Sequence, residues 1–328
     1  SLNAFVCLSP TAREEAAASA ARWRNGAPIG PLDGVPVAVK DNLVVKGMPA
    51  TFGSRLYAGT IAARDELPIR RLREAGAIVI GKTNTPEFAV EGYTCNDLFG
   101  VTRNPWAPAL TPGGSSGGSV AAVAAGLVPV AIGTDGGGST RRPAAYTGLV
   151  GLKPGIGRVP RANGLPQVLL DFEVVGTFTR SARDAALLDR VLAGPDRADP
   201  ASRCPSDAQA TDRPLRILSV ERIDANPCDP EIVTALHAAA DAFAALGHRV
   251  TRTELPFDSA GLAAIWSSIA EIGLGRLLAV EPDFADKVNP KYVAMARRGA
   301  ERSASDLLAI LETVAALRRQ VSEGFADF

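Results

Sequence analysis

Two segments rich in glycine and serine carry the residues best suited to chemistry. The first runs from Thr111 to Ser119 (Thr-Pro-Gly-Gly-Ser-Ser-Gly-Gly-Ser), and the second from Gly133 to Ala144 (Gly-Thr-Asp-Gly-Gly-Gly-Ser-Thr-Arg-Arg-Pro-Ala). Glycine has no Cβ, so backbone N–H groups in such runs can turn toward a ligand and stabilise an oxyanion beside a serine. The second segment therefore predicts a nucleophile, Ser139, which needs a base.

Histidine is scarce in this chain, and its scarcity narrows the choice of base. His237 falls inside an expected helix and His248 in a turn, so we expect both to be solvated or locally hydrogen-bonded. Lys40 ends the apolar run that begins at Gly34, and burial lowers the pKa of a lysine because it disfavours the charged form. Lys40 is therefore the strongest candidate, although many lysines at strand ends simply reach solvent.

A second motif points to a different class of protein. Residues Gly76 to Thr83 fit the pattern G-x-x-x-x-G-K-T, which would imply nucleoside triphosphate binding. In a phosphate-binding loop, a strand precedes the first glycine and a helix follows the lysine. Here the residues between the two glycines, Ala77 to Ile80, resemble a strand, and Pro86 follows soon after. We therefore expect a core strand at this position.

Apolar strands and helices alternate around these motifs. Strands are expected at residues 34–40, 77–80, 128–132, 172–178, 216–220 and 249–255, and helices at 10–24, 66–75, 117–126, 182–192, 231–246, 260–278 and 304–322. Such alternation predicts a layered α/β fold. Ala193 to Arg213 is rich in Pro, Asp, Ser and Arg without periodicity, which predicts a surface connection.

Composition and charge argue against several classes of protein. Lys+Arg and Asp+Glu both number 35, so the formal net charge is zero and gives no reason to expect a nucleic acid or a membrane surface as partner. No apolar run approaches the length of a membrane span. Cys7, Cys95, Cys204 and Cys228 form no C-x-x-C pair, which favours a reducing compartment, the cytoplasm.

These residues resemble the amidase signature family of serine amidohydrolases, whose central region carries such glycine-serine motifs and an upstream lysine. The resemblance extends from about Leu2 to Ser202, and from Arg203 onward only the general layout is similar. Family members usually continue beyond the helix that precedes Phe328, so the chain is expected to be truncated at its C-terminus. The segments that carry the resemblance are 34–42, 81–87, 103–106, 111–119, 133–144 and 148–154.

The resemblance implies a catalytic triad without histidine. Lys40 would be the base, Ser115 the bridging serine and Ser139 the acyl-forming nucleophile. Neutral Lys40 would take a proton from Ser115, and Ser115 would take one from Ser139 as it attacks an amide carbonyl. The family holds the bridging serine after a cis peptide bond, here Gly114–Ser115, for which a trans turn is the alternative.

The resemblance also assigns roles around the nucleophile. Backbone N–H groups of Gly136, Gly137 and Gly138, together with that of Ser139, would bind the oxyanion. Further residues would support the site in two ways, by orienting the relay and the glycine turn, and by holding the loop or binding substrate. Ser116 and Asp135 fit the first role, although both residue types favour turns in any case. Beyond the resemblance, one of Arg141 and Arg142 is expected to hold the loop while the other faces the pocket, where Arg142 would pair with a carboxylate on the substrate; a surface salt bridge is the alternative.

The implied protein is a single-domain amidase over residues 1–328, with a mixed central sheet covered by helices on both sides. Its core spans about residues 30–202, and residues 203–328 form a helical and sheet-completing part. It would hydrolyse a small linear carboxamide, with no metal or organic cofactor, no nucleic acid or membrane partner, and homodimerisation as an option. Alternatives are the glutaminase-type amidase subunit of a glutamyl-tRNA amidotransferase and a non-catalytic protein on the same fold.

Overall fold

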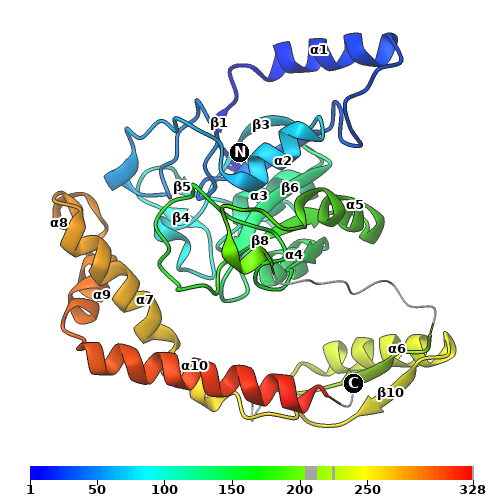
Figure 1. Ribbon diagram of the computed structural model, residues 1–328, viewed down its shortest axis with the longest axis vertical. Helices are drawn as coiled ribbons and strands as arrows, with labels where there is room; N and C mark the ends of the chain where they lie inside the picture. The colour runs from blue at the N-terminus through cyan, green and yellow to red at the C-terminus, as the bar shows by residue number, and fades with distance from the viewer. Residues whose placement is uncertain (204–212, 224–225, 327–328) are drawn as a thin grey trace.

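A six-stranded mixed sheet forms the centre of the computed structural model, which describes residues 1–203, 213–223 and 226–326 (Figure 1). The strand order is β1-β3-β2-β6-β8-β7. β3, β2 and β6 are parallel, whereas β1 is antiparallel to β3, and β8 is antiparallel to both β6 and β7. This confirms the predicted mixed sheet. The strands are β1 (Phe5–Leu8), β2 (Pro36–Lys40), β3 (Ile78–Thr83), β6 (Val130–Asp135), β7 (Val150–Leu152) and β8 (Val174–Thr179).

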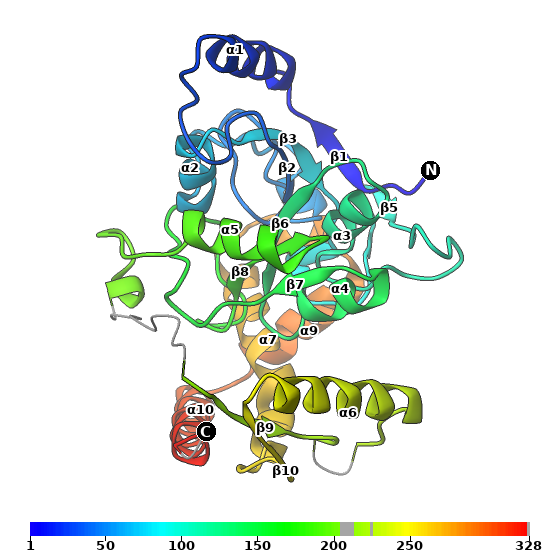
Figure 2. The same cartoon turned by 90° about the vertical axis from the view of Figure 1, so that its right-hand side faces the viewer.

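Helices cover both faces of this sheet, as predicted (Figure 2). α2 and α5 lie on one face and contact each other, while α3 and α4 lie on the other. α1 packs near β3 at the sheet edge. The bounds of these helices are α1 (Ala12–Arg24), α2 (Leu67–Glu74), α3 (Gly117–Ala124), α4 (Arg141–Thr147) and α5 (Ala182–Leu192).

The apolar run that ends at Lys40 is buried on both faces, which explains why it lacks polar alternation. Val37 and Val39 contribute to the core under α2 and α5. Ala38 points to the opposite face, where it packs against the small residues of α3. The strand therefore places Lys40 at its C-terminal end, between β3 and β6.

Among the described residues after Arg203, no strand joins the central sheet. β9 (Arg216–Ser219) and β10 (Arg249–Arg252) instead pair in parallel with each other, and α6 (Pro230–Ala245) joins them (Figures 1 and 2). Their side chains are largely exposed or half-buried, so these strands lack the two apolar faces of a central strand. Two further two-residue strands, β4 (Cys95–Asn96) and β5 (Gly100–Val101), form a small hairpin.

The remaining helices are α7 (Ala260–Val280), α8 (Phe284–Lys287), α9 (Pro290–Ala300) and α10 (Ala304–Gly324). Within the described residues, α7 alone has the length and apolar composition of a membrane-spanning helix, which corrects the expectation that no segment approaches that length. Leu274 and Leu277 of α7 pack with Val293 and Ala296 of α9 in an apolar cluster. Much of the apolar character of α7 therefore serves contacts between helices.

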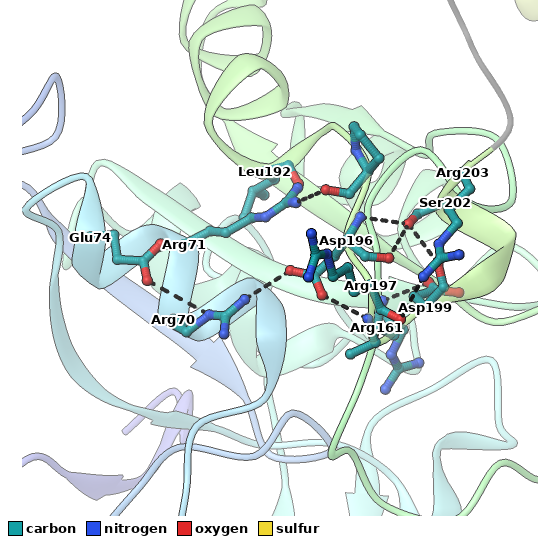
Figure 3. A network of polar contacts seen from close by, with 12 residues as sticks. Arg70, Arg71, Glu74, Arg161, Leu192, Asp196, Arg197, Asp199, Ser202 and Arg203 are labelled. Carbon is teal, nitrogen blue, oxygen red and sulfur yellow. Dashed lines mark hydrogen bonds and ion pairs between the residues drawn. The ribbon is translucent and has the colours of Figure 1, made fainter.

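The start of the predicted surface connection is tied down by arginines of α2 (Figure 3). Arg70 pairs with Asp196 at 2.8 Å, and Arg71 donates to the carbonyl oxygen of Leu192 at 2.5 Å. Residues 204–212 of that segment, Cys204 among them, lie outside the described residues. Cys7, Cys95 and Cys228 are free thiols.

Candidate active site

Lys40 and Ser115 meet in the interior of the protein. The Lys40 side chain is 0% exposed, and its Nζ lies 2.7 Å from Ser115 Oγ and 2.9 Å from Thr134 Oγ1. Both partners are hydroxyl groups, so neither one forces the amine to keep its charge. A neutral amine can donate to Thr134 and accept the Ser115 proton with its lone pair. The contact thus has the geometry of a base and its proton donor.

Burial and nearby charges together set the pKa of Lys40. Burial lowers the pKa of Lys40 to about 7, against partial opposition from the carboxylates of Glu173 and Asp135, while the positive charge of Arg161 adds to the lowering. A substantial fraction of the amine is therefore neutral at neutral pH. This is the property that the sequence led us to expect of a lysine at the end of a buried strand.

Ser115 is placed by the turn that leads into α3. The Gly114–Ser115 peptide bond is cis, as the resemblance implied. A Cβ built on Gly114 would lie 2.6 Å from the backbone nitrogen of Tyr93, so only glycine permits this approach. Ser116 is fully buried and donates from Oγ to the carbonyl oxygen of Thr134 at 3.2 Å. Ser116 thereby links the turn to β6.

Asp135 organises the glycine turn that follows β6. Its carboxylate accepts from the backbone N–H of Gly138 at 2.8 Å and of Thr140 at 2.9 Å, and it pairs with Arg141 at 2.9 Å. Burial acts to raise the pKa of Asp135, but the Arg141 side chain and these N–H groups outweigh it and lower the pKa to about 2. Asp135 therefore remains ionised and holds the turn.

The same contact changes the expected oxyanion site. Gly138 directs its N–H to Asp135, so the expectation that this group serves the oxyanion is not met. Carboxylates at turns attract such N–H groups strongly because the hydrogen bond is charge-assisted. Across the described parts of the chain, the N–H groups of Gly136, Gly137 and Ser139 have no acceptor. Of the four N–H groups expected to face an oxyanion, these three are therefore not engaged by another acceptor.

Ser139 follows directly on this turn and is half-buried. Within the described ranges, its hydroxyl makes no hydrogen bond to Ser115. The structure thus brings together the first two members of the predicted relay and leaves the third without a hydrogen bond to them. β6 nevertheless ties the two segments, because Thr134 contacts Lys40 and Asp135 holds the turn that carries Ser139.

Residues that the motifs did not reveal contact the glycine turn, which stays partly exposed. A Cβ on Gly137 would overlap Cζ2 of Trp266 in α7, and one on Gly136 would lie 2.7 Å from Cδ1 of Leu169. Trp266 in turn makes an edge contact with Phe172, with ring centroids 6.0 Å apart. Apolar side chains therefore pack against one side of the turn, and a larger residue at Gly136 or Gly137 would have to displace them.

The two arginines after Ser139 take different positions. Arg141 pairs with Asp135, as expected of the arginine that holds the loop. Arg142 donates to the carbonyl oxygen of Gly137 at 3.1 Å and lies against Gly92, where a Cβ would overlap its Nη1. No carboxylate in the described structure forms an ion pair with Arg142, so its charge lies beside the turn without an acidic partner.

Sequence reasoning missed a polar network behind Lys40. Thr134 Oγ1 also accepts from Asn42 Nδ2 at 2.8 Å, and Asn42 Nδ2 faces both carboxylate oxygens of Glu173 at 3.4 Å. Glu173 in turn pairs with Arg161 at 2.7 Å. The sequence offered only two hints of this network. Asn42 lies two residues after Lys40, and Thr134 lies in the second glycine motif.

The alternative chemistries fit the structure poorly. Lys82, the lysine of the phosphate-binding pattern, lies within β3 and is buried in an ion pair with Asp41 at 3.0 Å. His237 contacts Glu221 at 2.6 Å, and the ring Nδ1 of His248 accepts from the backbone N–H of Leu215, which confirms local hydrogen bonding for both. No group of three metal-ligating His, Cys, Asp or Glu side chains occurs within residues 1–203, 213–223 and 226–326.

Comparisons with known proteins match most of this chain. A family model described as Amidase matches residues 1–306. A glutamyl-tRNA(Gln) amidotransferase subunit from Synechococcus sp. (strain CC9605) is 39% identical over 91% of this chain and 63% of its own length. The corresponding subunit from Acidothermus cellulolyticus is 43% identical over 75% of this chain and 50% of its own length. The chain thus spans about half to just under two thirds of these relatives.

Solved structures superpose on nearly the whole chain. A 6-aminohexanoate cyclic dimer hydrolase complexed with substrate matches with a TM-score of 0.85 and 30% identity, over 98% of this chain and 69% of that one. A bacterial aryl acylamidase of the amidase signature enzymes matches with a TM-score of 0.84 and 32% identity, over 98% and 71%. The sheet and the helices on its two faces therefore follow an architecture that these hydrolases share.

Proposed function

Because the chain belongs to the amidase signature family, we propose that it hydrolyses a carboxamide C–N bond through an acyl-enzyme on Ser139, with Ser115 and neutral Lys40 as the proton relay. The observation that carries this proposal is the contact of 2.7 Å between a fully buried Lys40 amine and the Ser115 hydroxyl. Burial lowers the pKa of this amine to about 7, so the base is available near neutral pH.

The proposed reaction uses the groups of the site in sequence. Ser139 Oγ attacks the amide carbonyl while its proton passes to Ser115, whose own proton passes to Lys40. The N–H groups of Gly136 and Gly137, with that of Ser139, would stabilise the oxyanion, and loss of one such donor typically costs about 3 kcal/mol. The proton returns to the departing amine or ammonia, and water then hydrolyses the ester. Bound substrate would bring the Ser139 hydroxyl to Ser115, since catalytic contacts tighten in the substrate complex.

The substrate that we propose is a small linear amide, in a cytoplasmic enzyme that needs no cofactor and acts as a monomer or homodimer. The relatives named as amidotransferase subunits support a second candidate, a glutaminase-type subunit that passes ammonia to a partner protein. Ammonia release from glutamine only with such a partner present would favour this candidate. The retained pairing of Lys40 with Ser115 argues against a non-catalytic protein.

Covalent labelling tests the proposed nucleophile. A fluorophosphonate should phosphonylate Ser139, with loss of fluoride, and peptide mass spectrometry should locate the adduct. The adduct should be absent in Ser139→Ala and should form far more slowly in Lys40→Ala, because the base is missing. A slow amide substrate should protect the wild-type protein. Labelling at another serine, or an equal labelling rate in Lys40→Ala, would contradict the proposed roles.

Arg142 is the proposed site for a carboxylate on the substrate. We expect Arg142→Ala to lower kcat/KM by about 10–100-fold for amides that carry a carboxylate, which corresponds to the loss of one charge-assisted hydrogen bond. Neutral amides of similar size should be hydrolysed almost as before. Arg141→Ala is the matched control, since it loosens the turn held by Asp135 and should slow both substrate classes alike. Equal losses for both classes in Arg142→Ala would remove this role.

A further inference from the structure

The polar network behind Lys40 connects the amine to a buried ion pair. Thr134 Oγ1 receives hydrogen bonds from Lys40 Nζ at 2.9 Å and from Asn42 Nδ2 at 2.8 Å. Asn42 Nδ2 also faces the two oxygens of Glu173 at 3.4 Å each. Asn42 is 1% exposed, and its Oδ1 has no partner in the described part of the protein, so its orientation depends on these nitrogen contacts. The Glu173 carboxylate therefore helps to hold Thr134 against Lys40.

Glu173 is itself held by an arginine with little freedom. Arg161 donates from Nη1 to Glu173 at 2.7 Å and from Nε to Glu66 at 2.7 Å, and the Glu66 side chain is 0% exposed. The backbone N–H of Arg161 donates to Asp199 at 2.9 Å, within the network that the α2 arginines also join (Figure 3). Contacts from segments far apart in sequence thus fix Arg161, and through it the carboxylate of Glu173.

We propose that Glu173, held by Arg161, is a positioning residue for the reaction, which aligns Lys40 with Ser115 through Asn42 and Thr134 while the charges of Glu173 and Arg161 balance each other at the amine. The inference rests on the proposed role of Lys40 as the base. It assigns Glu173 and Arg161 no contact with substrate. Their effect on the reaction passes through the position and the protonation of Lys40 alone.

Few charged groups other than Glu173 and Arg161 lie where they could balance each other at the Lys40 amine. Burial lowers the pKa of Lys40, while Glu173 and Asp135 act to raise it and Arg161 acts to lower it further. Asp135, at the end of β6, is already paired with Arg141, and Asp41, just after β2, is paired with Lys82 of β3. α3, on the other side of β2, contributes no charged residue. Removal of either member of the Glu173–Arg161 pair should therefore unbalance the field at the amine.

Two substitutions give opposite predictions. In Glu173→Gln, Arg161 remains and the ammonium form of Lys40 loses a stabilising charge, so the acidic limb of the kcat/KM profile should move to lower pH by about half to one unit. In Arg161→Gln, the uncompensated carboxylate favours the ammonium form, so the limb should move to higher pH by a similar amount. Both variants should lose kcat by about 3–30-fold because the amine is less well aligned. Glu173→Asp should restore most of the wild-type limb.

The matched control is Asp171→Asn, which removes an exposed carboxylate two residues away that pairs with Arg318 at 2.7 Å. Its limb should stay at the wild-type pH. If Arg161→Gln does not fold, Arg161→Lys replaces it. This variant keeps the positive charge but loses the planar guanidinium group that contacts Glu66 and Glu173 together. Its kcat should fall, while the acidic limb of the kcat/KM profile should stay at the wild-type pH. Shifts of the same sign in Glu173→Gln and Arg161→Gln, or a shift in Asp171→Asn equal to theirs, would overturn the proposal.

A readout that does not need activity separates this inference from the proposed function. Titration of the Lys40 side-chain nitrogen by ¹⁵N NMR, assigned by the resonance missing from Lys40→Met, should show the same opposite shifts. If wild-type protein neither hydrolyses amides nor forms the Ser139 adduct, the proposed function fails. The titration then still shows whether Glu173 and Arg161 act on the protonation of Lys40. If the protein is active and the Lys40 titration does not move in either variant, the proposed function stands and this inference is wrong.

Discussion

Replacing Lys40 with methionine is expected to lower kcat/KM for amide hydrolysis by about 10²–10⁴-fold, the usual contribution of a general base. Methionine fills the buried site but cannot accept the Ser115 proton across the 2.7 Å contact. In the wild-type protein, kcat/KM should rise with pH through about 7, where burial places the pKa of Lys40, and then level off. The variant should lack this rise. Initial rates of ammonia or amine release from about pH 5 to 9 would measure both effects.

Two further variants make this prediction specific. Ser115→Ala should cause a similar loss, and the double variant should be little worse than either single one, because residues of one relay act as a unit. Lys46→Met, at an exposed lysine a few residues later, should remain fully active. Independent, multiplicative losses in the double variant would indicate that Lys40 and Ser115 do not share a proton path.

The same Lys40→Met variant is expected to be more stable than the wild-type protein near pH 7. Burial lowers the pKa of Lys40 to about 7 from 10.5, a shift that costs about 5 kcal/mol of folding free energy if fully expressed. Loss of the hydrogen bonds to Ser115 and Thr134 offsets part of the gain. We expect a net increase of about 1–3 kcal/mol in the free energy of unfolding, measured by urea denaturation.

The pH dependence of this difference identifies its cause. Between pH 7 and the ordinary lysine pKa of 10.5, the unfolded chain holds a proton on Lys40 that the folded protein has lost. Wild-type stability relative to the variant should therefore rise with pH across this window. The advantage of Lys40→Met should be largest at about pH 7 and below and should have shrunk markedly by about pH 10. An advantage that is constant with pH would indicate packing, and a less stable variant near neutral pH would contradict the prediction.

Much of the fold followed from local patterns. The helix expected at residues 182–192 occurs with those bounds, and the buried strand that ends at Lys40 begins only two residues later than predicted. α4 was not predicted, because Arg-Arg-Pro at its start resembles a turn, and α9 was missed between two longer helices. The separate pairing of β9 with β10 was also unexpected, since strand partners are chosen by tertiary packing.

The sequence by itself determined the parts of the site that depend on local backbone and apolar pattern: a lysine at the end of a buried strand, a glycine turn ending in Ser139, and a serine turn before a small-residue helix. Only the tertiary structure decided which groups meet. It brought Lys40 against Ser115, directed Gly138 to Asp135, and laid Trp266 over Gly137. The reason is that side-chain neighbours are set by packing between strands and helices that are distant in sequence. Burial and charge depend on separation in space, not on separation along the chain.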